Sequence, residues 1–378
     1  MTGPRPLHLL AFCGATAWGG AEIVLGHLLA ALDERIDVDL LGVDPAVVER
    51  LAARRPGTGW DTVPPIRDDR DLGRIWVHRQ AMARISPDIV QLNLPVPFAD
   101  PYTVLSAATL PRVPVIGVAH LPMPMPGPRI ARLVRATASH LAAVVGVSSG
   151  AAREVEQLLG LGEGTVRVVH NGVPEPEERR AVPAPPGRVV VGAVGRLHEQ
   201  KGFDVLLRAV AGLPEVHVVV VGDGQERAGL ERLAADLGLH GRVSWLGWSD
   251  HASGYVRSFD VLAVPSRYEG LPLVVLEAML GRVPLVVTPV GGIPDAVRDG
   301  ESGLVVPVDD VAALRSALAR LAADPGLGHR LAAAAEVEAR RRFTAEAMAR
   351  SYEALYDEVL ARRRFSRRSA RSRPRRWR

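Results

Sequence analysis

Cysteine, aromatic residues and long apolar segments are all scarce in this 378-residue chain. The single cysteine, Cys13, excludes an internal disulfide and a cage of thiolates around a metal. Aromatic residues make up only 4% of the chain, which argues against a base-stacking surface for nucleic acid. No apolar run approaches the roughly 20 residues of a membrane span, and the first residues show no basic segment followed by a signal-like apolar core. We therefore expect a cytoplasmic enzyme.

Lysine is almost absent, because Lys201 is the only lysine among the 46 basic side chains. A compact ammonium group suits a phosphate as a point charge, so this position is a candidate for chemistry that arginine performs less well. The net charge of +4 hides an asymmetry: residues 362–378 hold ten arginines and no acid. The rest of the chain carries 36 basic and 42 acidic side chains, a net charge of −6. The body of the protein is therefore mildly acidic, and its basic character belongs to the tail.

Hydrophobic residues form 47% of the chain and occur as short runs that alternate with amphipathic segments. The alternation stops in residues 174–187, which are rich in proline and charge, and restarts at residue 189. Short apolar strands that alternate with helices predict parallel sheets covered on both faces. We predict an α/β protein of two Rossmann-like domains. Ligands of such sheets bind outside the carboxyl ends of the strands, so we expect the site in a cleft between the domains.

The predicted parts are a first domain, a linker, a second domain, a C-terminal helix that packs back toward the first domain, and a disordered arginine-rich tail. Their boundaries are 1–173, 174–187, 188–343, 344–361 and 362–378.

Two glutamates flank a predicted helix start in residues 266–279. This stretch follows an apolar strand at 260–265, and Pro272 fits the first turn of the next helix. Glu269 then lies in the loop before the helix and Glu277 lies inside it. The free N–H groups and the positive dipole end of a helix N-terminus suit a phosphate. Carboxylates on each side of such an anion site match a sugar nucleotide, with acceptors for sugar and ribose hydroxyls and donors for the diphosphate.

Two cations follow another buried strand. Arg196 comes two residues after the strand at 189–194, and Lys201 and Gly202 precede the next helix. This position places both cations at the rim of the expected cleft, and a solvated turn between strand and helix is the alternative.

Taken together, these motifs resemble the retaining glycosyltransferases of family 4, which have the two-domain GT-B fold. The resemblance covers nearly the whole chain before the tail. The matching pieces are Gly19-Gly20-Ala21-Glu22, His120, Asn171-Gly172-Val173, Gly195-Arg196 with Lys201-Gly202, Val221-Gly222-Asp223-Gly224, Glu269 with Glu277, Gly291-Gly292-Ile293-Pro294, and Asp299-Gly300 with Gly303-Leu304.

The resemblance implies that the first domain binds the acceptor and the second binds the donor. It implies that Arg196 and Lys201 bind the donor diphosphate and neutralise it as it leaves. Glu269 would hold sugar hydroxyls and Glu277 the ribose hydroxyls. Backbone N–H groups would bind the phosphates around Gly270, Leu271, Pro272 and Leu273. Preorganised cations and helix-end donors can do the work of a metal, so we expect neither a metal nor a cofactor beyond the nucleotide-sugar co-substrate.

The first predicted domain contributes a glycine loop and a histidine. The glycines at 14, 19 and 20 do not fit a dinucleotide fingerprint, which disfavours a nicotinamide dehydrogenase. Gly19 and Gly20 would let the backbone approach the donor phosphates or the acceptor, or they form a turn with positive φ. His120 ends a strand, and the family match implies a catalytic role or one near the donor sugar; a core histidine is the alternative.

A basic helix is predicted at residues 130–141, with Arg129, Arg132 and Arg135 beside apolar positions. Such a helix can rest on an anionic membrane, or it is an ordinary surface helix of an α/β domain. The arginine-rich tail would add nonspecific attraction to an anionic surface, without specific nucleic-acid binding. We expect a cytoplasmic protein with possible peripheral contact at the inner membrane face.

These features favour a retaining, metal-independent glycosyltransferase that moves a sugar from a nucleoside-diphosphate sugar to an acceptor hydroxyl. The acceptor would be a polysaccharide, a lipid-linked saccharide or a secondary metabolite. The alternatives are a sugar-nucleotide epimerase on the same plan and a non-catalytic subunit that binds nucleotide sugars.

Overall fold

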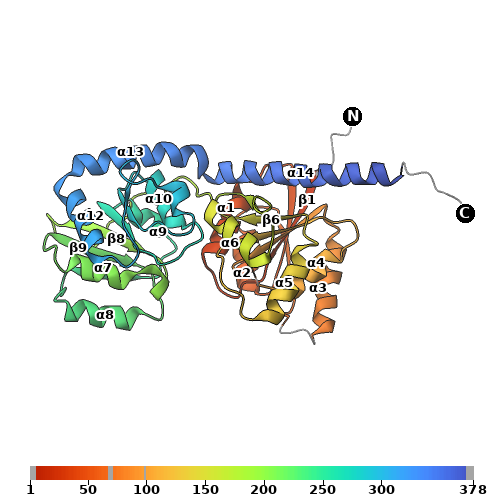
Figure 1. The fold of residues 1–378 in the computed structure, drawn as a ribbon, viewed down its shortest axis with the longest axis horizontal. Helices are drawn as coiled ribbons and strands as arrows, with labels where there is room; N and C mark the ends of the chain where they lie inside the picture. The colour runs from red at the N-terminus through yellow and green to blue at the C-terminus, as the bar shows by residue number, and fades with distance from the viewer. Residues whose placement is uncertain (1–5, 67–70, 98, 372–378) are drawn as a thin grey trace, which may run out of the picture. The chain divides into compact units, whose positions relative to one another are not determined.

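The computed structural model describes residues 6–66, 71–97 and 99–371. These residues form two compact units, and the first unit contains both ends of the described chain (Figure 1). Unit 1 comprises residues 1–170 and 345–378, and unit 2 comprises residues 171–344. In the parts described, no helix combines the length and the apolarity that a membrane span requires.

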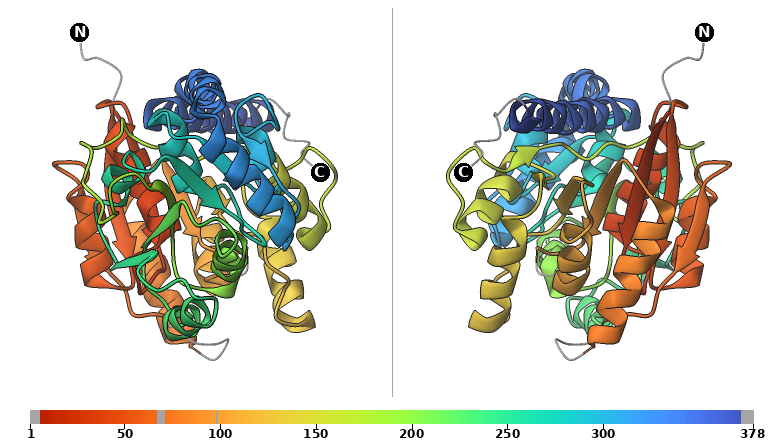
Figure 2. Two further views of the ribbon diagram at one scale, coloured as in Figure 1. Left: turned by 90° about the vertical axis from the view of Figure 1, so that its left-hand side faces the viewer. Right: turned by 90° about the vertical axis from the view of Figure 1, so that its right-hand side faces the viewer.

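Unit 1 is built on a seven-stranded sheet in which all pairs of neighbouring strands are parallel, in the order β3-β2-β1-β4-β5-β6-β7. The strands are β1 (Leu7–Cys13), β2 (Ile36–Gly42), β3 (Gly59–Thr62), β4 (Ile89–Leu94), β5 (Val115–Ala119), β6 (Ala143–Gly146) and β7 (Arg167–Val168). The helices are α1 (Gly20–Ala31), α2 (Pro45–Ala52), α3 (Leu72–Ile85), α4 (Pro101–Ala108), α5 (Pro128–Ala138), α6 (Ser149–Leu159) and α14 (Ala345–Arg371). One group of helices, α1, α2 and α14, packs together, as do α3 to α6, so that helices cover the sheet (Figure 2).

Unit 2 repeats this plan with a six-stranded parallel sheet in the order β10-β9-β8-β11-β12-β13. The strands are β8 (Val189–Val194), β9 (Val216–Val221), β10 (Val243–Gly247), β11 (Val261–Val264), β12 (Leu285–Val287) and β13 (Leu304–Val305). The helices are a 3₁₀ turn η1 (Glu199–Lys201), α7 (Phe203–Val210), α8 (Arg227–Asp236), α9 (Ala252–Val256), α10 (Leu273–Leu280), α11 (Ile293–Ala296), α12 (Val311–Ala323) and α13 (Pro325–Arg342).

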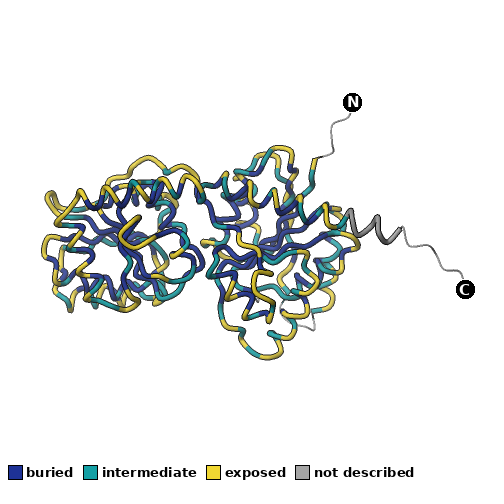
Figure 3. Tube along the Cα trace, turned by 45° about the horizontal axis from the view of Figure 1, so that its top comes forward, coloured by how far each residue is buried: buried dark blue, intermediate teal, exposed yellow. Residues whose placement is uncertain are grey.

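Continuous apolar strands explain both sheets. Every residue of β4, β5, β9 and β11 is buried, as a parallel sheet with helices on both faces requires (Figure 3). In each unit the strand order reverses direction beside the first strand, at β1/β4 in unit 1 and at β8/β11 in unit 2. The carboxyl edge of the sheet beside such a reversal is the usual ligand position of doubly wound sheets. The predicted α/β class with two Rossmann-like sheets is therefore confirmed.

The segment at residues 174–187, which we predicted to be a linker, belongs to unit 2. The boundary falls earlier, between His170 and Asn171. Arg180 N donates to Gly254 O at 3.0 Å, and Ser244 Oγ donates to Pro183 O at 2.8 Å. Its proline-rich and charged composition prevents regular structure, but it does not prevent packing along the edge of a sheet domain.

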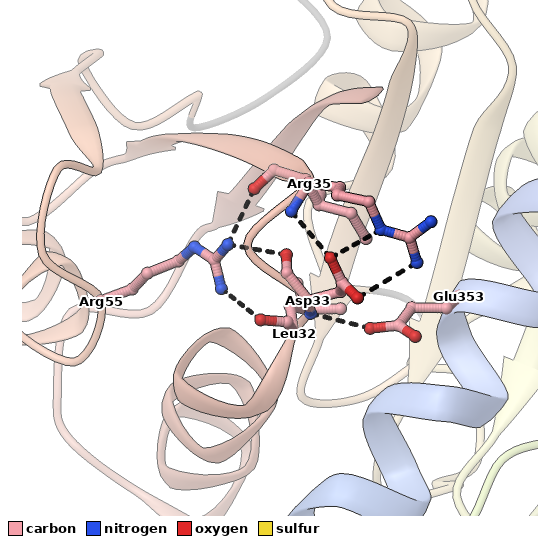
Figure 4. Close-up of polar contacts among 6 residues, drawn as sticks. Leu32, Asp33, Arg35, Arg55 and Glu353 are labelled. Atoms are coloured by element: carbon pink, nitrogen blue, oxygen red, sulfur yellow. Dashed lines mark hydrogen bonds and ion pairs between the residues drawn. The ribbon is translucent and has the colours of Figure 1, made fainter. Parts of the chain in front are cut away.

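Helix α14 packs on unit 1 against α1. Tyr356 Oη donates a 2.6 Å hydrogen bond to Gln91 Oε1 of β4, and both residues are buried. Asp33 N, in the turn after α1, donates to Glu353 Oε1 at 2.9 Å (Figure 4). Arg55 stabilises the same turn, because its guanidinium donates to the carbonyl oxygens of Leu32 and Asp33.

Helix α14 also corrects the predicted boundary of the tail, because it continues to Arg371. Residues 362–371 are therefore helical, not disordered as we predicted, while residues 372–378 lie outside the described residues. Arginine and alanine favour helix even where no apolar face repeats, and Arg362 pairs with Glu358 one turn earlier at 2.6 Å.

Candidate functional site

Two loops of unit 2 interlock at the carboxyl edge of its sheet. One follows β8 and carries Arg196 and Lys201; the other follows the neighbouring strand β11 and carries Glu269. Arg267 N donates to Gln200 O at 2.7 Å, and Gln200 Nε2 donates to Tyr268 O at 2.8 Å. The strand-order reversal thus brings together two loops that are almost 70 residues apart in the sequence.

Lys201 and Glu269 form an ion pair at the centre of these loops. Lys201 Nζ lies 2.6 Å from Glu269 Oε1, and the exposed fractions of the two side chains are 19% and 6%. Ser266 Oγ donates to the same carboxylate oxygen at 2.8 Å. The single lysine of the chain and the first glutamate of the pair therefore meet, as two partners of one largely desolvated contact. Removal of either partner would leave a buried charge without compensation.

Arg267 fixes the loop that carries Glu269. Its Nη1 and Nη2 donate to the two carboxylate oxygens of Asp204 at 3.0 and 2.9 Å, and its Nε donates to Asp309 at 2.8 Å. Asp204 lies in the first turn of α7, directly after the loop that carries Lys201. This two-pronged pairing locks the separation of the two loops and hence of Lys201 and Glu269.

Glycine is required at two positions around this pair. Gly202 has φ 63° and Gly291 has φ 55°, both in the left-handed region. A Cβ at Gly202 would overlap the carbonyl oxygen of Pro265, and one at Gly291 would overlap that of Glu269. Their lack of a side chain lets the backbones of two neighbouring loops pack directly against the Glu269 loop.

Helix α10 begins beside the ion pair. Pro272 is its N-cap residue, with ψ 127°, so the helix starts at Leu273 and the prediction of Pro272 in the first turn is wrong by one residue. The extended ψ of Pro272 takes it out of the helical region. Asn171 Nδ2 donates to Leu271 O at 2.8 Å, and Gly292 N donates to Gly270 O. Residues 270–273, where we predicted phosphate binding, are thus held at a helix N-terminus by bonds to their carbonyl groups.

Glu277 lies in α10, about one turn beyond its start at Leu273. Burial raises the pKa of this carboxyl to about 7, and the negative charge of Glu177 adds to the increase. The side chain is partly buried, so Glu277 is a carboxyl group that exchanges its proton near neutral pH.

Arg196 is exposed at the start of its loop, two residues beyond β8. Within the described ranges, the Arg196 guanidinium makes no hydrogen bond or ion pair with another residue. It is therefore available for a ligand, in contrast to Lys201, which Glu269 already engages.

In unit 1, His120 follows β5 and contacts a residue that the sequence did not single out. His120 Nε2 lies 2.7 Å from Asn93 Oδ1, and both residues are buried. Asn93, in β4, also donates from Nδ2 to Ala21 O at the start of α1, at 3.3 Å. With Asn93 Oδ1 as the acceptor, Nε2 of His120 carries the proton and Nδ1 has a free lone pair. Burial lowers the pKa of His120 to about 4, so the ring is neutral at physiological pH.

The glycine loop of unit 1 leads into α1. Gly19 is the N-cap residue with φ −151°, and Gly20 is the first residue of the helix. Neither is a turn with positive φ, so that interpretation is wrong. A Cβ on Gly20 would meet nothing within 4 Å, which leaves open space above the helix start. Glu22, in the first turn, is buried, and Cys13 Sγ lies 4.0 Å from its Oε1. Burial, with the charge of Glu22, raises the pKa of Cys13 to about 12, so this thiol stays protonated.

Sequence reasoning thus located Lys201 and Glu269 but missed Asn93, and it did not identify the roles of Ser266 and Arg267. Asn93 could have been found from the sequence, because it is a polar residue in the largely apolar strand β4.

The chain was compared with known proteins. The family described as Glycosyl transferases group 1 matches residues 174–338, and Glycosyltransferase Family 4 matches residues 18–175. The lipopolysaccharide core biosynthesis glycosyltransferase LpsE of Rhizobium meliloti is 30% identical over 348 residues, which cover 88% of this chain and 94% of that protein. A D-inositol 3-phosphate glycosyltransferase of Mycolicibacterium gilvum is 40% identical over 192 residues, or 46% of this chain and 43% of that protein.

Among solved structures, Anabaena HepE in complex with UDP superposes with a TM-score of 0.78 at 20% identity, covering 93% of this chain and 100% of that one. HepE in complex with UDP-glucose gives 0.77 at 21% identity, covering 94% and 99%.

Proposed function

Because this chain belongs to the group 1 glycosyltransferases of family 4 and has their GT-B fold, we propose that it transfers a sugar from a nucleoside-diphosphate sugar to an acceptor hydroxyl with retention of anomeric configuration. The observation that carries this proposal is the Lys201–Glu269 pair beside the N-terminus of α10. It combines a cation, carboxylate oxygens and the N-terminus of a helix at one place.

The diphosphate of the donor would bind Arg196, Lys201 and backbone N–H groups of the segment 270–273, to which Pro272 contributes no donor. Departure of the nucleoside diphosphate develops negative charge on its oxygen, and preorganised donors stabilise that charge without reorganisation. Arg196 has a free guanidinium for this purpose. Lys201 can turn one of its three N–H groups to the phosphate while Glu269, itself held by Ser266, keeps the ammonium group in place.

Glu269 would accept hydrogen bonds from hydroxyls of the donor sugar through its second carboxylate oxygen, since Oε1 is occupied by Lys201 and Ser266. Glu277 would accept from the ribose hydroxyls. Because Glu269 is committed to the donor, we infer front-face attack, in which the leaving phosphate accepts the proton of the acceptor hydroxyl. His120 would act as a neutral group near the reacting carbon, since its low pKa excludes a general acid near pH 7.

We also propose that transfer requires no metal and no cofactor, because the two cations and the helix N-terminus supply the positive potential at the leaving group. Activity that survives exhaustive chelation by EDTA would support this part, and loss of activity restored by a divalent cation would refute it.

A thermal-shift screen over nucleoside diphosphates and their sugars tests donor binding directly, with UDP and UDP-glucose as first probes because HepE binds them. Arg196→Ala and Lys201→Ala, each shown to be folded, should lose both the shift and the transfer activity. Full activity in either variant would refute the proposed donor site. The anomeric configuration of the product, read by NMR, decides between retention and inversion.

We further propose a cytoplasmic location with peripheral contact at the inner membrane face. Arg129, Arg132 and Arg135 of α5 are all exposed, and no carboxylate of the described chain pairs with them. Co-sedimentation with vesicles that contain anionic lipid, compared with neutral vesicles, tests this contact. Arg132→Glu with Arg135→Glu should abolish it, and equal binding to both kinds of vesicle would contradict it.

A further inference from the structure

One carboxylate at the carboxyl edge of the unit 1 sheet does not cap the helix that it precedes. Asp100 ends the loop after β4 and occupies the N-cap position of α4. Its carboxylate lies against Gly14, in the loop after the neighbouring strand β1. A Cβ added at Gly14 would overlap Asp100 Oδ2 and would lie 2.9 Å from Oδ1. Gly14 therefore leaves the space that this carboxylate fills.

Aspartate at an N-cap normally accepts hydrogen bonds from the first N–H groups of the helix. Three other aspartates of this chain do so: Asp44 before α2, Asp310 before α12 and Asp324 before α13. Asp100 makes no such bond. Its backbone is left-handed, with φ 48° and ψ 45°, a conformation that costs free energy in any residue other than glycine. The chain thus forgoes a helix cap and accepts strain, and the result is a carboxylate that faces Gly14.

The Asp100 carboxylate accepts no hydrogen bond from the described part of the chain. Among the described residues, none donates a hydrogen bond to the Asp100 carboxylate or forms an ion pair with it, and Cys13 is a titratable group near it. Burial raises the pKa of Asp100 to about 6. The residue nevertheless keeps partial exposure, so a ligand can reach it. A largely desolvated carboxylate without a donor is costly, and such groups in native proteins call for an explanation.

The position of Asp100 supplies that explanation. β1 and β4 are adjacent at the strand-order reversal of the sheet, and doubly wound domains bind ligands at the carboxyl edge there. His120 follows β5, the next strand in the sheet. Asp100 and His120 therefore both lie at the carboxyl edge of the unit 1 sheet.

We propose that Asp100 binds the acceptor by accepting a hydrogen bond from a hydroxyl group of a polyhydroxylated, carbohydrate-like molecule, and that Gly14 is glycine to leave room for it. This inference rests on the proposed glycosyltransferase function and assigns its acceptor side. Asp100 orients the acceptor and takes no proton, since the leaving phosphate accepts the proton of the attacking hydroxyl. The donor binds elsewhere, in unit 2, so a change at Asp100 should leave donor binding intact.

Asp100→Asn is the first test, because asparagine keeps the shape and tolerates the left-handed backbone. Transfer from UDP-glucose is measured with methyl α-glucoside, myo-inositol and glycerol as acceptors. We expect the acceptor KM to rise about ten- to hundredfold, the loss for a hydrogen bond to a charged group. The UDP-induced thermal shift should not change. Asp44→Asn is the matched control, since it alters an N-cap aspartate of the same unit and should leave every parameter unchanged.

Gly14→Ala gives an independent perturbation, because its Cβ displaces the Asp100 carboxylate without a change of charge. It should reproduce the increase in acceptor KM. An unchanged KM in the Asp100→Asn variant, or a lost UDP shift, would overturn the inference. Absence of a UDP shift in the wild-type protein would instead count against the donor assignment.

Stability tests the inference even if none of these acceptors is used. At pH 8 the Asp100 carboxylate is ionised, so Asp100→Asn removes a desolvated charge that nothing compensates. We expect the Tm of the variant to be about 2–4 °C above that of the wild-type protein. Such an increase is typical of a residue that serves ligand binding and lowers the stability of the fold. A lower Tm would show that Asp100 stabilises the fold, and the inference would fail.

Discussion

Binding of a nucleotide sugar should release a proton from Glu277. Burial and the charge of Glu177 raise the pKa of this carboxyl to about 7, so it is partly protonated in the free protein at neutral pH. We propose that the bound ribose hydroxyls donate to Glu277, and an ionised carboxylate accepts both hydrogen bonds more strongly than the protonated acid. Binding then favours the carboxylate, and the proton leaves.

The size of this effect follows from the pKa. A group that titrates at pH 7 is about nine-tenths protonated at pH 6, half at pH 7 and one-tenth at pH 8, and these are the numbers of protons we expect to be released per bound donor. Below pH 7 the affinity for the nucleotide sugar should therefore increase with pH, by up to about tenfold per pH unit. The stability effect has the opposite sign. The folded protein retains a proton that the unfolded chain loses, so the contribution of Glu277 to stability is full below its ordinary pKa and falls as pH rises through about 7.

Isothermal titration calorimetry measures this release, because released protons are taken up by the buffer and add its ionisation enthalpy to the signal. UDP-glucose is a better probe than UDP, since a terminal phosphate itself titrates near about pH 6. Titrations at pH 6, 7 and 8 in phosphate and in imidazole, which both buffer over this range but differ in ionisation enthalpy, should give apparent enthalpies that differ most at pH 6.

Two variants make this prediction specific. Glu277→Gln should bind more weakly and show no buffer dependence. Glu177→Gln removes the nearby charge, lowers the pKa of Glu277 and should reduce the release at pH 7. Equal enthalpies in both buffers for the wild-type protein, or a buffer dependence that persists in Glu277→Gln, would refute the reasoning.

Three further predictions concern the donor site and the C-terminal helix. Lys201→Met leaves the buried Glu269 unpaired, so the free energy of unfolding should fall by about 3–5 kcal/mol. The same change should reduce kcat at least about a hundredfold, and an undiminished kcat would contradict this. Arg267→Lys keeps the charge but loses the two-pronged pairing, and kcat should fall about tenfold with the fold intact by circular dichroism, whereas wild-type kinetics would show that the clamp is dispensable. Tyr356→Phe leaves Gln91 Oε1 without its donor, which should cost about 1–2 kcal/mol in urea unfolding; an unchanged midpoint would mean that the bond does not anchor α14.

Local patterns in the sequence determined the doubly wound sheets and the position of the loops that we propose to bind the donor. Residues 189–194 and 261–264 are apolar throughout, and only strands buried on both faces combine such short runs with flanking helices. Because ligands of parallel sheets bind at the carboxyl edge, the residues after these strands could be assigned to one site. Strand β3 was not predicted, because its residues are exposed or only partly buried and form no apolar run.

The tertiary structure decided what each polar group contacts. Composition indicated irregular chain at 174–187 but not that it packs along unit 2, and it indicated charge at the C-terminus but not a helix to Arg371. The pairing of His120 with Asn93 joins residues 27 positions apart, and Asp100 meets Gly14 across 86 positions. Hydrophobic periodicity is a local property that a window of sequence contains. A hydrogen-bond partner, a desolvated carboxylate or a strained backbone depends on which distant segments the sheet order brings together, and only the folded chain specifies that order.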